Sequence, residues 1–188
     1  MSTVLEAMAA EATTCTRCRL SDGRRTVVFG SGSRNAQLMF VGEGPGARED
    51  EQGLPFVGRS GQLLDRLLAE ELGIDRTDCY ITNVVKCRPP ENRDPRPDEI
   101  AACRPYLEQQ VALVDPAVIV TLGNFSSKLL LETDVGITKL RGRSYRFGDP
   151  ERHLVPTFHP AAALRGGADV LARMRADLVR AKVLMGDR

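Results

Sequence analysis

The chain has 188 residues, 42% of them hydrophobic and 27% charged, a balance typical of a soluble globular domain and not of a disordered chain. Its formal net charge is +1, so any surface that binds nucleic acid must be local. No apolar run approaches the ~20 residues of a membrane helix, and the first residues lack the basic start of a signal peptide. We expect one domain over residues 1–188, monomeric and cytoplasmic, with no membrane partner.

Four short apolar runs predict buried strands, and they lie at Gln37–Val41, Cys79–Val85, Ala117–Leu122 and His153–Phe158. Helical periodicity lies between them. In residues 60–73 five leucines share one face, with Ser60 as the expected cap and Gly73 as the stop. Further helices are predicted over 97–114 and 169–185, with a shorter one capped by Asn124. Residues 139–148 alternate and predict an antiparallel excursion before the last strand. This order predicts an α/β fold, a parallel sheet with helices on both faces.

Polar side chains follow three of these strands. The stretch "GEGPGAREDEQGLPFVG" (Gly42–Gly58) follows the first strand and is glycine-rich, but it lacks lysine and carries four acids, which would repel a phosphate. Asn83 lies near the end of the second strand, and His159 follows the fourth. Because ligands bind at the carboxyl ends of strands in open parallel sheets, we expect Glu43, Asn83 and His159 to converge.

Four of the five cysteines form two pairs. Cys15 and Cys18 make a C-x-x-C motif, and Cys87 and Cys103 flank a proline-rich loop (87–99). In a reducing compartment four thiolates indicate a zinc ion or an iron–sulfur cluster, and the wide second pair slightly favours the cluster. Unligated buried cysteines are the plainer alternative, as we expect for Cys79 in its strand. A metal here would tie residues 15–18 to 87–103 as a scaffold.

Taken together, "GEGPGAREDEQGLPFVG", "NVVKC", the four cysteines and "HPAAALR" (His159–Arg165) resemble the family 4 uracil-DNA glycosylases, which are iron–sulfur enzymes. The motifs run in order from Cys15 to Arg165. The resemblance implies a three-layer α/β/α sandwich around a four-stranded parallel sheet. It also implies a 4Fe-4S cluster on the four cysteines, with zinc as the lesser alternative. The implied activity is hydrolysis of the N-glycosidic bond of uracil in single- or double-stranded DNA, during base excision repair at the nucleoid.

The resemblance also implies roles within a base pocket. Phe56 would stack on the flipped base, and the amide of Asn83 would read the edge of uracil and reject cytosine. His159 would donate to uracil O2 as negative charge develops there. Glu43 is the preferred acid for water and for the sugar cation. Glu49 is the second candidate, or it lines the C5 side of the base.

The remaining implied contacts involve backbone and DNA. Glycine has no Cβ, so the backbone N–H groups around Gly44 and Gly46 can approach the base. Leu164 would wedge into the gap that the flipped base leaves, and Arg165 would contact a phosphate. This sequence has alanines after the His-Pro pair where the family often has serine and larger residues, so it departs from the family's pattern next to the expected wedge.

Three other readings compete with this one. A superfamily branch that crosslinks to uracil-DNA uses a histidine in a basic insertion, but residues 88–99 contain no histidine. A family 5 enzyme departs from the acid pattern that Glu43 retains. A non-catalytic iron–sulfur module that senses DNA damage would explain the cluster, yet it has little use for a carboxylate, an amide and an imidazole at three strand ends.

Overall fold

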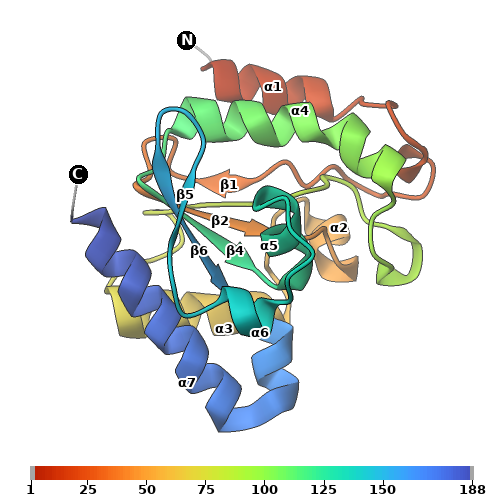
Figure 1. The fold of residues 1–188 in the computed structure, drawn as a ribbon. Helices are drawn as coiled ribbons and strands as arrows, with labels where there is room; N and C mark the ends of the chain where they lie inside the picture. Colours follow the sequence, from red (N-terminus) through yellow and green to blue (C-terminus); the bar gives the residue numbers. More distant parts are fainter. Residues whose placement is uncertain (1–2, 187–188) are drawn as a thin grey trace.

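The computed structural model describes residues 3–186 and places a six-stranded sheet between two layers of helices (Figure 1). The strand order is β1-β3-β2-β4-β6-β5. The four inner strands are parallel to one another: β3 (Tyr80–Asn83), β2 (Leu38–Gly42), β4 (Val118–Leu122) and β6 (Arg152–Thr157). They match the four predicted strands, and the α/β class and parallel core are confirmed.

Two antiparallel strands at the sheet edges make the total six and not four. The predicted excursion forms β5 (Tyr145–Phe147), which pairs with β6. The other edge strand, β1 (Ser31–Gly32), pairs with β3 and was not predicted. Two residues are too short for any alternation of polar and apolar side chains to appear in the sequence.

Both faces of the sheet are covered by helices (Figure 1). One layer contains α1 (Val4–Ala12), α4 (Pro97–Val114) and α5 (Asn124–Leu130), and the opposite layer contains α3 (Arg59–Leu67) and α7 (Pro160–Met185). Leu38 and Phe40 of β2 pack toward α3 and α7, whereas Met39 and Val41 pack toward α4 and α5. Alternate strand residues therefore supply two separate cores, which explains why the strand is apolar throughout.

Short elements connect these layers near the carboxyl ends of the strands. Helix α2 (Ala47–Gln52) follows β2, and α6 (Ile137–Leu140) precedes β5. Leu68–Leu72 extend α3 as a π-helical turn that ends at Gly73, as predicted. Two 3₁₀ turns occupy Arg19–Ser21 and Pro90–Asn92, the second inside the proline-rich loop. Within the described range 3–186, no helix combines the length and apolar character needed to cross a membrane.

The structure corrects three predicted helix starts. Gly58, not Ser60, is the N-cap of α3, and the backbone N–H of Gly58 donates to Glu49 instead of being capped locally. Gly123, not Asn124, caps α5, and the Asn124 side chain accepts from the N–H of Ile137 in α6. Helix α7 begins at Pro160, not 169, because its first turns are separated from the rest by a break at Gly167 (φ +73°) that interrupts the periodicity.

Candidate active site

The three polar strand ends converge on one cavity of about 700 Å³, here called the strand-end cavity. Glu43 follows β2, Asn83 ends β3, and His159 follows β6. Because β3, β2, β4 and β6 are parallel, their carboxyl ends share one edge of the sheet. The other predicted residues that line the cavity are Gly44, Gly46, Glu49, Phe56 and Arg165. Residues far apart in the chain therefore form one site.

Asn83 presents an unused acceptor to this cavity. Its side chain is 2% exposed, and its Oδ1 has no hydrogen-bond partner among the described residues. A buried acceptor without a donor costs about 1–3 kcal/mol, so a ligand that brings an N–H would relieve this cost. A Cβ at Gly42 would lie 2.3 Å from Asn83 Oδ1 and 2.7 Å from the Phe56 ring. Glycine at position 42 is what allows these two side chains to meet.

Phe56 is held in place through its backbone. It has a positive φ of 52°, which is unfavourable for a residue with a large side chain. Arg76 Nη2 donates to the carbonyls of Pro55 (2.7 Å) and Phe56 (3.2 Å). A Cβ at Gly61 would lie 1.7 Å from the Phe56 carbonyl oxygen, so this approach requires glycine. Strained backbone of this kind persists where the surroundings over-determine it, often at binding sites.

The ring of His159 lies beside that of Phe56, with centroids 5.7 Å apart and planes inclined by 33°. Nδ1 accepts from the Ala161 backbone N–H at 3.1 Å, so the proton of the neutral ring is on Nε2. Burial, reinforced by the charge of Arg165, lowers the pKa of His159 to about 4, although Glu49 acts in the opposite direction. At neutral pH this side chain is an uncharged N–H donor.

The two candidate acids have different surroundings. Glu49 Oε1 accepts from the N–H groups of Val57 and Gly58, both at 3.0 Å, and so fastens α2 to the start of α3. Glu43 is half-buried, and burial, together with the charge and hydrogen bonding of neighbouring Asp94, raises its pKa to about 7. Glu43 is therefore poised to exchange a proton near neutral pH, whereas Glu49 is occupied by backbone donors.

Gly44 and Gly46 have little room for a side chain, and the atoms that would be in the way belong to neighbouring residues and not to a bound base. A Cβ at Gly44 would lie 2.8 Å from a Val85 methyl group, and one at Gly46 would lie 2.8 Å from Glu49 Oε2. These glycines are needed for packing around the turn, and both also line the cavity. Leu164 is 43% exposed on the first part of α7, next to Arg165 at the cavity.

The proline-rich loop contributes cavity residues that the sequence analysis missed, namely Asn92, Arg93 and Asp94. The fully buried carboxylate of Glu99 anchors the loop by accepting from Arg93 at 2.6 and 2.9 Å and from the Arg96 N–H at 2.8 Å. Binding and catalytic residues are often carried by loops that a rigid scaffold positions. Nothing in the local pattern reveals which distant strand end the loop faces.

The four paired cysteines line one further cavity, together with Arg24 and Lys86. Cys87 Sγ accepts from Arg24 Nη1 at 3.4 Å, and Cys103 Sγ accepts from the Lys86 N–H at 3.3 Å. Such donors suit thiolate ligands. Over residues 3–186, no three cysteine, histidine or acidic side chains are grouped closely enough for a single metal ion. All four cysteines nevertheless line the same cavity, so they are the residues that could hold a metal centre here.

Lys86 connects the cysteine cavity to Asn83. Its fully buried Nζ donates to Thr82 Oγ1 (2.7 Å), the Asn83 carbonyl (2.6 Å) and Gln110 Oε1 (2.6 Å). Burial lowers the pKa of this lysine to about 7. Its three acceptors satisfy all three donors of the ammonium group, which explains how the side chain is tolerated inside the protein.

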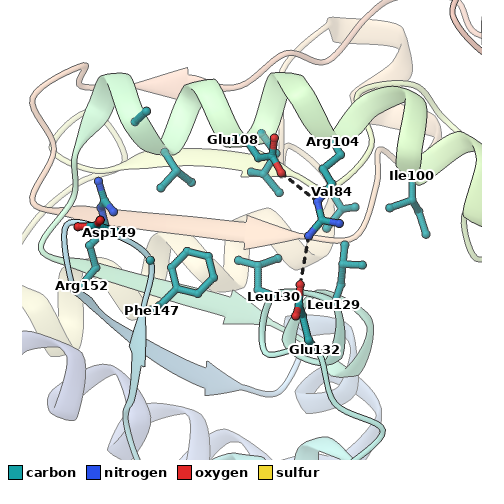
Figure 2. A pocket seen from close by; sticks show the side chains of 14 residues that line it. Val84, Ile100, Arg104, Glu108, Leu129, Leu130, Glu132, Phe147, Asp149 and Arg152 are labelled. Atoms are coloured by element: carbon teal, nitrogen blue, oxygen red, sulfur yellow. Dashed lines mark hydrogen bonds and ion pairs between the residues drawn. The ribbon is translucent and has the colours of Figure 1, made fainter.

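A separate cavity of about 300 Å³ lies between α4, α5 and β5 (Figure 2). Its walls are largely apolar and include Leu129, Leu130 and Phe147. Arg104 forms an ion pair with Glu108 of the same helix (3.0 Å) and a second one with Glu132 on the opposite wall (3.5 Å). None of the converging strand-end residues lines this cavity. Since a binding site for a polar base needs placed donors and acceptors, the strand-end cavity is the better candidate.

Comparisons with known proteins identify the family of the chain. A family model described as the uracil DNA glycosylase superfamily matches residues 29–180. A "Type-4 uracil-DNA glycosylase" of Sulfurisphaera tokodaii is 48% identical over 166 residues, which cover 85% of this chain and 76% of the relative. One of the same name from Thermotoga maritima is 47% identical over 161 residues, with 85% and 83% covered. A "Type-5 uracil-DNA glycosylase" of Thermus thermophilus is 31% identical over 152 residues, with 70% and 68% covered.

Proposed function

Because the chain belongs to the uracil-DNA glycosylase superfamily, and within it to the type-4 enzymes, we propose that it removes uracil from DNA by hydrolysis of the N-glycosidic bond. The products are free uracil and an abasic site, as base excision repair requires. The single observation that carries this proposal is the buried, unpartnered Asn83 Oδ1 beside the Phe56 ring. We further propose that the protein acts as a monomer in the cytoplasm, on DNA of the nucleoid.

Recognition rests on the Asn83 amide. Uracil flipped into the strand-end cavity presents N3–H, which can donate to Oδ1, and O4, which can accept from the amide NH₂. Cytosine offers an acceptor and a donor in the opposite order, so both contacts become repulsive. The face of Phe56 covers the flat ring, a stacking contact worth about 1–3 kcal/mol. Together these two side chains would hold uracil and exclude cytosine.

Bond cleavage rests on His159 and Glu43. As the C1′–N1 bond breaks, negative charge develops on uracil O2, where the Nε2–H of a neutral imidazole stabilises it. The sugar becomes cationic, and the Glu43 carboxylate stabilises this charge and takes a proton from the attacking water. Glu49 supports the turn that carries these groups. Leu164 is the wedge that fills the gap in the DNA, and Arg165 contacts a phosphate.

The four cysteines would hold a 4Fe-4S cluster, with zinc as the alternative. Bound there, the group supplies a crosslink between residues 15–18 and the ends of 87–103, and it takes no part in base release. The purified protein is expected to be brown, with visible absorbance and about one iron and one inorganic sulfide per cysteine ligand. One zinc ion and no colour would decide for the alternative.

An excision assay tests the function. The protein is incubated with a labelled oligonucleotide that contains one uracil, and abasic sites are then cleaved with alkali. Cleavage at the uracil, and none in matched cytosine or thymine oligonucleotides, is the expected result. Binding without cleavage would favour a non-catalytic damage-sensing module. A DNA adduct that survives denaturation would favour the crosslinking branch of the superfamily.

A further inference from the structure

Asp94 brings a second carboxyl group to Glu43. The two carboxyl groups lie close enough that the protonated Glu43 side chain can donate a hydrogen bond to Asp94, and the charge of Asp94 acts on Glu43. Both line the strand-end cavity, and both also line an adjacent cavity of about 700 Å³ that extends toward α5, with His159 shared between the two. Glu43 follows a central strand, whereas Asp94 comes from the proline-rich loop. The pair therefore lies at the junction of the two cavities.

The position of Asp94 is fixed by its loop. Arg93 donates to the Asp94 backbone carbonyl at 2.9 Å while its guanidinium is held by the buried Glu99 carboxylate. The Asp94 side chain itself is solvent-exposed, in contrast to the half-buried Glu43. One member of the pair thus contacts the interior of the site and the other contacts water.

Two carboxylates in contact cannot both stay ionised at little cost unless cations compensate them. The charged or titratable groups on the strand-end side are Arg48, Glu49, Arg59, Arg93, His159 and Arg165. Those on the side of the adjacent cavity are Arg104, Lys128, Glu132 and Asp134. Arg93 and Arg104 are occupied by Glu99 and by Glu108 and Glu132. His159 is neutral at pH 7, as its lowered pKa indicates.

We infer that Asp94 is a positioning residue for Glu43: it accepts a hydrogen bond from the protonated Glu43 carboxyl group and so decides when Glu43 is a free carboxylate. This inference rests on the proposed function. Below neutral pH Glu43 keeps its proton and cannot accept one from water, so base release slows. When the water attacks C1′, its proton passes to Glu43 and from there to solvent. The released uracil anion takes a proton from solvent, so the net reaction consumes one water molecule.

The test compares Asp94→Asn with Glu91→Gln, which removes an acid from the same loop but outside both cavities. Single-turnover release of uracil from a single-stranded oligonucleotide is measured between pH 5 and 9 with cluster-loaded protein. In the wild type and in Glu91→Gln the rate should fall as pH drops through about 7, the pKa of Glu43. Asp94→Asn removes a like charge beside Glu43. The pH at which the rate falls should therefore be lower than in the wild type by about half a unit or more.

An unchanged acid limb in Asp94→Asn, or a lower rate at every pH without a shift, would overturn the inference. A second readout does not depend on excision. The carboxyl of Glu43, labelled with ¹³C and assigned by its loss in Glu43→Gln, is titrated by NMR in the wild type and in Asp94→Asn. A lower midpoint in the variant supports the pair even if no uracil is released, which separates failure of this inference from failure of the proposed function. Equal midpoints overturn it.

Discussion

Gly42 has no side chain, and this absence determines the geometry of the base pocket. Asn83 Oδ1 and the tip of the Phe56 ring both occupy the space that a Cβ at position 42 would take. The proposed recognition therefore depends on the backbone of one strand as much as on the amide on the next. The unsatisfied acceptor of Asn83 is a cost to the free protein. A bound base with an N–H at this position would offset the cost, which would tie specificity to a single atom.

Replacing Asn83 by aspartate tests this atom. The carboxylate cannot donate a hydrogen bond to uracil O4 and repels that oxygen. The rate of uracil excision should therefore fall by about 10-fold to 100-fold, or the base specificity should relax toward cytosine. Single-turnover rates on single-stranded uracil and cytosine oligonucleotides measure both effects, because no base pair has to be broken first. A wild-type rate on uracil would remove Asn83 from recognition. A thermal melt checks that the variant is folded.

The two glutamates can be separated by isosteric substitutions. Glu43→Gln removes the base that accepts a proton from water, so single-turnover release should slow by roughly 100-fold or more without loss of DNA binding. Glu49→Gln keeps a carbonyl oxygen that can accept from Val57 and Gly58, so its rate should stay within a few-fold of wild type. The two variants are measured side by side with binding by fluorescence anisotropy. The opposite pattern would move the water role to Glu49.

At the scale of elements, α7 is attached to the molecule by Asp177. This fully buried carboxylate accepts from Arg141 Nε and Nη2 (both 2.8 Å), from the Gly142 N–H (3.1 Å) and from the Thr157 hydroxyl (2.8 Å). One side chain thus connects the helix to the end of β6 and to the segment after α6. Since Thr157 lies two residues before His159, this attachment also holds the strand end that leads into the active site.

Asp177→Ala should destabilise the protein strongly because it leaves Arg141 buried without its partner. A loss of about 3–5 kcal/mol in the free energy of unfolding is expected, which corresponds to roughly 10 °C in Tm for a chain of this size. Asp169→Ala on the same helix is the matched control. Asp169 is 73% exposed in its pair with Arg173, so its loss should cost less than about 1 kcal/mol. Similar melting curves for the two variants would contradict this assignment.

At the scale of the whole molecule, the cysteine cavity joins distant parts of the chain. Its walls come from the segment after α1, the start of the proline-rich loop and a turn of α4. The same loop then delivers Asn92, Arg93 and Asp94 to the strand-end cavity. A cluster bound at one end of this loop, as proposed above, would restrict the geometry of the active site at its other end.

Cys103→Ala should abolish the visible absorbance of the cluster and make the segment that contains residues 13–30 sensitive to limited proteolysis. Loss of a structural metal site removes stabilisation that the apo-protein does not recover. Cys79→Ala is the control, because Cys79 is buried in the core and does not line the cysteine cavity. Its absorbance should match the wild type. If Cys103→Ala kept the colour and the resistance to protease, Cys103 would not be a ligand.

Much of this arrangement follows from the sequence by itself. Four apolar runs determined the parallel core, because a strand buried on both faces has to be apolar throughout. The carboxyl-end rule for parallel sheets was enough to bring Glu43, Asn83 and His159 together. The grouping of four of the five cysteines was likewise readable: Cys79 alone lay inside a predicted strand, and the other four line one cavity.

Only the tertiary structure decided how the acids differ and what the proline-rich loop does. Glu43 and Glu49 are the same residue type on one short stretch, and they separate only because Glu49 is bound by N–H groups at the start of α3. Asp94 contacts Glu43 across a long stretch of chain that no local pattern spans. Hydrogen-bond partners and burial set the charge of a carboxyl group, and both are properties of the folded protein and not of its sequence neighbours.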